Sequence, residues 1–76
     1  MMYVMANDEM DTIFSEAKMR LSEMMQELER AENEVHAGRF SYADPALRRL
    51  VSLSERFRSQ ASVLMQRMLR LEQTKY

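Results

Sequence analysis

The sequence has 76 residues and contains no cysteine, no tryptophan, one glycine, one proline and one histidine. Without cysteine the chain has no disulfide and no thiolate metal ligand, the usual stabilisers of a domain this small. It also has no run of the ~20 apolar residues that cross a bilayer, so no membrane insertion is expected. Stability must come from an efficient helix packing or from association with another protein.

Because glycine and proline are scarce, breaks in secondary structure are confined to the middle of the chain. Asn7 followed by two acidic residues is typical of a helix start, where the helix dipole favours negative charge. Nothing interrupts a helix from about residue 7 to residue 37. Gly38 then stands where a left-handed C-cap is expected.

A second helix start follows shortly after. Asp44 as N-cap, with Pro45 at the first helical position, is a strong start signal because proline has no N–H to leave unpaired there. The sequence therefore predicts a loop over residues 38–44 and a second helix from about 45 to 73. A connection this short makes the helices antiparallel, within a single unit over residues 1–76.

Apolar residues in both halves recur in alternating steps of three and four, the pattern of helices packed lengthwise. The sequence thus predicts an all-α fold, a two-helix antiparallel hairpin that resembles a coiled coil. The main residues of the predicted hairpin seam are Phe14, Leu21, Met24 and Leu28 in the first helix and Leu50, Phe57, Leu64 and Leu71 in the second.

The charges are segregated between the halves. Residues 1–37 hold nine acids and three bases, a net −6, and residues 38–76 hold eight bases and three acids, a net +5. Exposed pairs each contribute only a few tenths of a kcal/mol, so the pattern selects the pairing more than it stabilises it. Two registers fit the seam, with paired residue numbers that sum to 85 or to 78, and the sequence leaves both open.

More apolar residues are present than a two-helix seam needs. Met25, Val51, Met65 and Leu69 lie off the seam, and we predict that they bind a protein partner. The nine methionines favour this interpretation, because flexible thioether side chains adapt to varied surfaces. The alternative is a slightly wide core face with scattered exposed apolar residues, which is normal for soluble proteins.

No group of residues predicts chemistry. Glu32 and His36 share a helix face but have no third metal ligand, and Ser41 and Tyr42 have no histidine in reach as a base. The arginines of the second helix lie beside an acidic helix, without interleaved aromatic residues for stacking, so nucleic-acid binding is not expected. We therefore predict no catalytic residues, no metal and no cofactor, and a protein that is not an enzyme.

Two short segments have an open interpretation. The aromatic residues Phe40 and Tyr42, predicted in the loop, either fold back over the end of the hairpin or project toward a partner. The apolar leader over residues 1–5 lacks a basic segment and is too short for a secretory signal. It is either a fraying tail or a segment that orders on binding.

From about Glu16 to Leu71 the chain resembles the YscE-type co-chaperones of bacterial type III secretion systems. The resemblance consists of an acidic first helix over residues 21–29, a turn at 37–39, the restart at 44–45 and a long second helix. It implies a cytoplasmic bacterial protein that pairs with a larger helical-repeat chaperone. Together the two would keep a secretion needle subunit monomeric before export.

Three other kinds of two-helix protein are alternatives. Needle subunits have similar size but turn through a proline-rich connection and polymerise. The small subunit of exonuclease VII has a Leu- and Glu-rich second helix, from which the run over residues 47–50 departs. A homodimer that forms a four-helix bundle is the plain structural alternative. We expect a protein-binding co-chaperone or adaptor.

Overall fold

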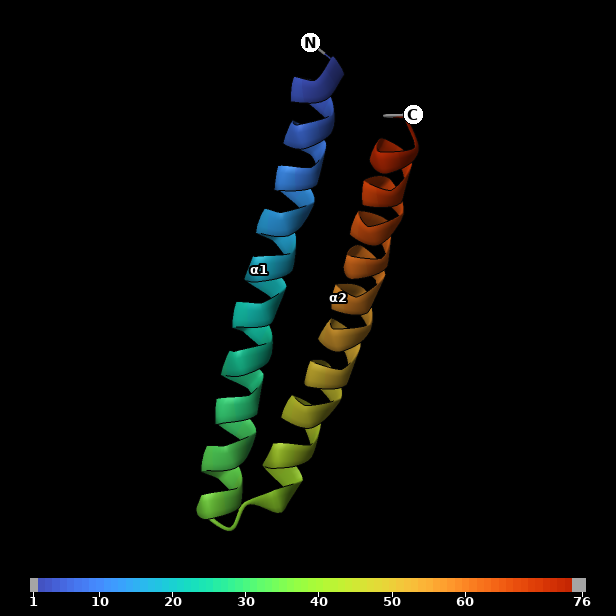
Figure 1. The fold of residues 1–76 in the computed structure, drawn as a ribbon. Coiled ribbons are helices and arrows are strands. Elements are labelled where there is room, and N and C mark those ends of the chain that lie inside the picture. Colours follow the sequence, from blue (N-terminus) through green and yellow to red (C-terminus); the bar gives the residue numbers. More distant parts are fainter. Residues whose placement is uncertain (1, 75–76) are drawn as a thin grey trace.

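The computed structural model describes the backbone of residues 2–74 and the side chains of residues 9–73. Two helices of 35 residues each, α1 (Met2–His36) and α2 (Phe40–Thr74), lie side by side and antiparallel, with both termini at the same end (Figure 1). No strand occurs over residues 2–74. The predicted all-α helical hairpin is confirmed. With extents of 58 × 17 × 13 Å, the molecule is a single layer of two helices.

The helices are longer than the sequence predicts. The backbone of α1 is already helical at Met2, five residues before the expected start at Asn7. The side chains of the apolar leader and of Asn7 lie outside the described residues. Phe40 and Tyr42 lie in the first turn of α2 rather than in a loop, and their side chains are exposed.

The turn ends α1 through a Schellman motif at Gly38. The Gly38 N–H donates to the Val35 carbonyl at 3.0 Å, and the Arg39 N–H donates to the Glu34 carbonyl at 2.8 Å. Gly38 has a φ of 77°, in the left-handed region that glycine adopts without strain. The predicted left-handed C-cap at Gly38 is confirmed, and the chain reverses between His36 and Phe40.

The same turn is held by a side-chain pair. Arg39 Nε donates to Glu34 Oε2 at 2.6 Å and Arg39 Nη2 donates to Glu34 Oε1 at 3.1 Å, a two-pronged contact. These hydrogen bonds lower the pKa of the Glu34 carboxyl and, with the charge of Glu34, raise the pKa of Arg39. Backbone and side chains thus fix the direction in which α2 leaves the turn.

The predicted helix start at Asp44 and Pro45 is wrong. α2 begins at Phe40 with Arg39 as its N-cap, since the Arg39 carbonyl accepts the N–H groups of Tyr42 at 3.1 Å and Ala43 at 3.3 Å. Pro45 lies inside the helix, and because it has no N–H, one backbone bond near the start of α2 is missing. Asp44 is not a cap; its carboxylate pairs with Arg48 one turn later, at 2.8 Å, and both side chains are exposed.

The core of the hairpin is small and consists mostly of alanine. Ala31 packs against Ala43 and Ala46 next to the turn, where the absence of large side chains lets the helices approach closely. In the rest of the described chain, only Ala17, Leu53 and Leu64 are buried hydrophobic residues. No side chain among residues 9–73 is fully buried. The two helices alone therefore leave most of their large apolar side chains uncovered.

Candidate protein-binding surface

The contact face of α1 is rotated relative to the predicted seam. Over residues 9–36, only eight residues are buried or half-buried, and they recur in steps of three and four. These residues are Met10, Ile13, Ala17, Arg20, Met24, Glu27, Ala31 and Glu34.

Three seam residues predicted for the first helix lie outside this contact. The structure leaves Phe14 43% exposed, Leu21 46% and Leu28 54%. On α2 the prediction comes closer, because Leu64 is buried and Leu50, Phe57 and Leu71 are half-buried, as is Met24 on α1. The predicted seam therefore agrees with the observed contact on α2 but not on α1.

Polar contacts across the hairpin explain the rotation of α1. Arg49 Nη1 donates to Oε1 of the buried Glu27 at 3.3 Å. At the open end Arg67 donates to the carboxylate of Glu9. The Glu27 carboxylate reaches α2 only if its own row, with Ile13, Arg20 and Glu34, turns inward, which moves Leu28 to the edge.

A third polar layer lies midway along the hairpin. Arg20 Nε donates to Gln60 Oε1 at 3.1 Å, and Gln60 Nε2 donates to Glu16 Oε2 at 3.1 Å. All these contacts join residues whose numbers sum to between 76 and 80. They agree with the second of the two registers that the sequence left open, the one that sums to 78.

Nine of the large exposed apolar side chains, drawn from both helices, lie on one side of the pair. On α1, Phe14, Leu21, Leu28 and Val35 each follow a residue of the contact by four positions, and on α2 Leu47 follows Ala43 and Met68 follows Leu64 in the same way. Met25 and Val51 lie one further step of four along, after Leu21 and Leu47. Four residues turn about 40° around a helix. Because the helices are antiparallel and face each other, the same sense of rotation brings both sets to the same side.

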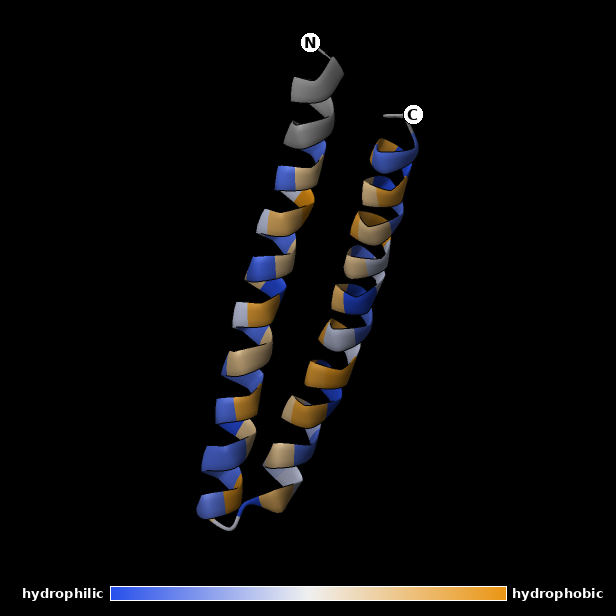
Figure 2. Ribbon diagram, viewed as in Figure 1, coloured by the Kyte–Doolittle hydropathy of each residue, from blue (hydrophilic) through white to orange (hydrophobic). Residues whose placement is uncertain are grey.

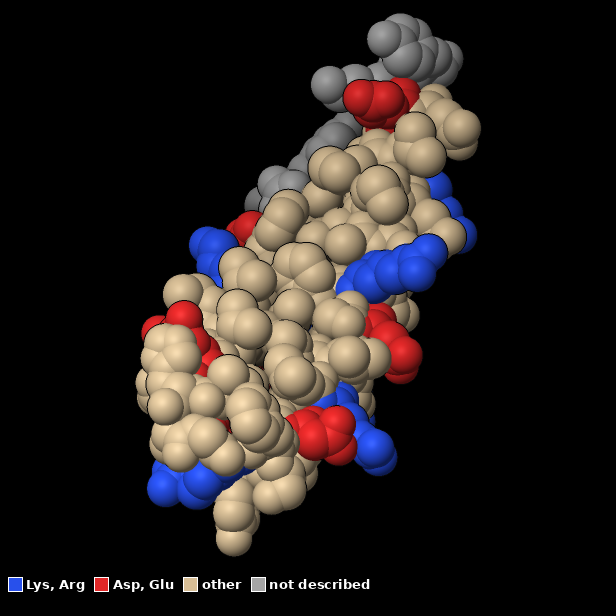
Figure 3. Space-filling view, turned by 90° about the horizontal axis from the view of Figure 1, so that it is seen from below, with Lys and Arg blue, Asp and Glu red and all other residues tan. Residues whose placement is uncertain are grey.

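We call this surface the apolar face. Its large side chains are 41–59% exposed. Figure 3, which looks at the hairpin from the turn end, shows uncharged side chains over much of the visible surface and charged side chains mostly at its edges. Hydropathy along the ribbons shows the same alternation of apolar and polar positions on each helix (Figure 2). The large side chains of the apolar face are Phe14, Leu21, Met25, Leu28, Val35, Leu47, Val51, Met65 and Met68.

The opposite side of the hairpin is polar. It holds the Glu16–Gln60 contact and a hollow of about 130 Å³, which Val63 shares with these two residues. The buried Glu27 also receives Arg30 Nη1 at 3.5 Å, one turn along α1. Ion pairs thus lie on one side of the helix pair, while nothing in the described chain covers the other.

The four predicted partner-binding residues are all exposed: Met25 59%, Val51 56%, Met65 56% and Leu69 57%. Met65 and Leu69 line a shallow hollow of about 330 Å³ on α2, together with Met68 and Glu72. Met25 and Val51 stand on opposite helices at the margins of the apolar face, at the same level of the hairpin because their numbers sum to 76. The structure thus places these residues in two groups, not in one cluster.

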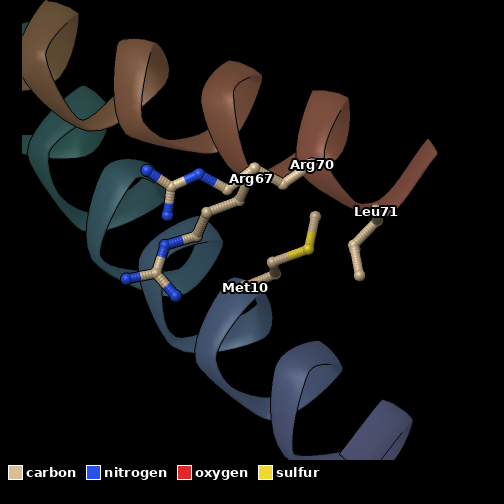
Figure 4. Close-up of a pocket in the computed structure, with 4 residues that line it drawn as sticks. All are labelled: Met10, Arg67, Arg70 and Leu71. Carbon is tan, nitrogen blue, oxygen red and sulfur yellow. The ribbon is translucent and has the colours of Figure 1, made fainter. Parts of the chain in front are cut away.

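A third hollow lies between the open ends of the helices. It measures about 230 Å³ and is lined by Met10 of α1 and by Arg67, Arg70 and Leu71 of α2. Both arginine side chains extend toward α1, and the Met10 thioether lies between them and Leu71 (Figure 4). Arg67 is engaged by Glu9, so this hollow is an apolar site with a partly neutralised basic rim.

No metal-ligand cluster is found among residues 9–73: no three histidine, cysteine or carboxylate side chains there come together. Glu32 and His36 are both exposed, one turn apart near the end of α1. Ser41 and Tyr42 are exposed in the first turn of α2. In the part of the chain that is described, no helix is both long and apolar enough to cross a membrane.

The inward positions of Arg20, Glu27 and Gln60 do not follow from the apolar pattern of the sequence, because that pattern assigns the contact to apolar residues alone. The segregation of charge between the halves was the signal for them. Acids of α1 opposite basic residues of α2 require inward or edge positions, and Glu27–Arg49 is such a pair.

Comparison of the chain with protein-family models, with curated proteins and with solved structures finds no match. What the protein does must therefore be argued from its surface.

Proposed function

We propose that this protein is a non-enzymatic binding subunit whose apolar face packs on helices of a partner protein. The observation that supports it is the face itself, a row of large apolar side chains along both helices of a single-layer molecule. A contiguous exposed apolar surface with charged margins is typical of a protein-binding site. Helices that pack lengthwise on such a surface bind through residues spaced three, four and seven apart.

The more specific proposal is a co-chaperone of bacterial type III secretion, active in the cytoplasm. The resemblance in length, turn and acidic first helix supports it. In this role the hairpin binds a larger helical-repeat chaperone, and together they cover the apolar surface of a needle subunit until export. The apolar face supplies the packing surface, and the ion pairs on the opposite side set the register of the hairpin.

The test is co-expression with the proteins encoded beside it, followed by affinity purification and size exclusion. The Val51→Glu/Met65→Glu variant places two carboxylates on the margin of the apolar face, at exposed positions. It should lose the partner while its circular dichroism stays helical. The matched control is Met19→Glu/Val63→Glu, which adds the same charges at exposed apolar positions away from that face.

Two results would contradict the proposal. One is unfolding of the Val51→Glu/Met65→Glu chain, which would place these residues in the core of the hairpin. The other is equal loss of the partner in both variants. Filaments that grow from the isolated chain would instead favour the alternative of a self-assembling needle-type subunit.

A further inference from the structure

The apolar face of α1 has a regular repeat that is complementary to itself. Phe14, Leu21, Leu28 and Val35 stand seven residues apart, and all are at least 43% exposed. When two helices with such a row meet antiparallel, the rows interdigitate along their whole length. The pairs are then Phe14 with Val35 of the second copy and Leu21 with its Leu28.

The margin of this row carries charges in a matching arrangement. Lys18, Met25 and Glu32 also stand seven residues apart, on the outer edge of the apolar face. Lys18 and Glu32 are exposed, and neither forms a salt bridge within the described hairpin. They lie seven residues on either side of Met25. A twofold axis at Met25 therefore brings Lys18 of each copy to Glu32 of the other.

The same arrangement recurs on α2. Asp44 and Arg58 lie seven residues on either side of Val51, and all three are exposed. A twofold axis at Val51 brings Arg58 of each copy to Asp44 of the other. Asp44 also pairs with Arg48 of its own helix, and its side chain is 60% exposed.

One axis serves both helices. Contacts across the hairpin join residues whose numbers sum to between 76 and 80, and Met25 and Val51 sum to 76. Met25 and Val51, the midpoints of the two charge rows, therefore lie at the same level of the hairpin, on the same face. Independent charge rows on α1 and α2 thus specify the same axis, perpendicular to the helices.

From this coincidence we infer that the apolar face binds a second copy of this chain, and that the two hairpins form an antiparallel four-helix bundle. The inference rests on the proposed use of the apolar face for binding. In the bundle α1 packs on α1 of the second copy and α2 on its α2, with the twofold axis at Met25 and Val51. Each charge pair occurs twice, so four salt bridges border the apolar contact.

The charges exclude the other face-to-face arrangement. If α1 packed on α2 of the second copy, with the axis along the helices, residues at equal levels would meet. Lys18 would then face Arg58, and Glu32 would face Asp44, since both pairs sum to 76. Like charges at both margins disfavour that packing and select the first.

The bundle covers only part of each hairpin. The axis at Met25 and Val51 overlaps residues 14–36 and 40–62 of the two copies. Met65, Met68 and Leu69 project beyond the overlap, and their hollow on α2 stays open at both ends of the bundle. The dimer is therefore compatible with binding of a different protein at these ends.

Sedimentation equilibrium over a wide range of concentrations tests the inference. The unmodified chain should be a dimer that dissociates on dilution. Lys18→Glu and Glu32→Lys should each raise the dissociation constant roughly tenfold, because each replaces two attractive pairs by two repulsive ones. The Lys18→Glu/Glu32→Lys double variant should restore it. Within one helix these residues lie about 21 Å apart, so the rescue must arise between copies.

Glu29→Lys, an exposed charge reversal on the outer side of α1, is the matched control and should leave the dissociation constant unchanged. A chain that is monomeric at every concentration overturns the inference and leaves the binding of a different partner intact. A dimer without rescue in the double variant overturns the proposed arrangement. Growth into open filaments overturns a closed dimer.

Discussion

Arg49 of α2 donates a hydrogen bond across the hairpin to Glu27 of α1, the one charged side chain among residues 9–73 that is buried. The contact is incomplete. Oε1 of Glu27 receives both Arg49 and Arg30, at 3.3 and 3.5 Å, whereas Oε2 is buried without a hydrogen-bond partner. A buried acceptor without a partner costs stability. Glu27 therefore contributes to the register of the hairpin more than to its stability.

Variants of Glu27 and Arg49 should show that the pair contributes little to stability. Glu27→Met, of similar volume and without charge, should leave the free energy of unfolding unchanged or raise it by about 1 kcal/mol. Arg49→Ala should lower it by about 1–2 kcal/mol, since the buried carboxylate then keeps only Arg30. Urea unfolding followed by circular dichroism, at one protein concentration, measures both. A large loss in Glu27→Met would show that the pair itself stabilises the hairpin.

Substitutions at Gly38 should lower the stability of the hairpin in proportion to how poorly the new residue adopts the left-handed conformation. Gly38→Ala should cost about 1 kcal/mol, because a Cβ is strained at a φ of 77°. A Cβ there meets nothing within 4 Å, so the cost is one of conformation and not of space. Gly38→Asn should cost less, since asparagine adopts this region more readily. Equal losses in thermal stability for the two variants would contradict the assignment.

The Glu34–Arg39 contact should make stability depend on pH. Hydrogen bonds from Arg39 lower the pKa of Glu34 in the folded chain. The contribution is therefore complete above the pKa of an unfolded glutamate and is lost as the pH falls through the lower folded value. Arg39→Gln should remove this part of the acid dependence. An NMR titration of Glu34 in both proteins measures the pKa directly, and an unchanged value in the variant would contradict the prediction.

Truncations should separate the core from the apolar face. Leu64 is 6% exposed, and Leu64→Ala should cost about 2–5 kcal/mol of the free energy of unfolding. Leu21 is 46% exposed, so Leu21→Ala should cost less than half as much in the dissociated chain. Chemical denaturation at high dilution compares them. Equal losses in the free energy of unfolding for the two variants would show that Leu21 belongs to the contact between the two helices.

Much of the fold follows from the sequence because its breaks are so few. Gly38 and the unbroken segments on either side predict two long antiparallel helices, which the structure has. The predicted start of α2 was wrong because Asp44 and Pro45 form a strong local signal for a helix start. The Schellman turn at Gly38 reverses the chain before these residues are reached. Local capping signals contain no information on tertiary packing. Here the small residues Ala43 and Ala46 let α2 pack against α1 directly after the turn.

The rotation of α1 was the second error. The row of Phe14, Leu21 and Leu28 has the spacing of a seam, and so does the row one residue earlier along the helix, which holds Arg20 and Glu27. Apolar periodicity favours the first row for the hairpin contact. The structure uses the second, because basic and amide side chains of α2 pair with it. The first row is then left exposed.

The most direct test of the account uses the absence of cysteine from the chain. Met25→Cys places one thiol per chain on the proposed twofold axis, where two copies bring their Cβ atoms within disulfide reach. Met19→Cys, at 66% exposure against 59% for Met25, is the matched control on the same helix. Mild oxidation followed by a non-reducing gel should give a disulfide-linked dimer for Met25→Cys and a monomer for Met19→Cys. A monomer for Met25→Cys, or equal linkage of both, would contradict binding of a second copy to the apolar face.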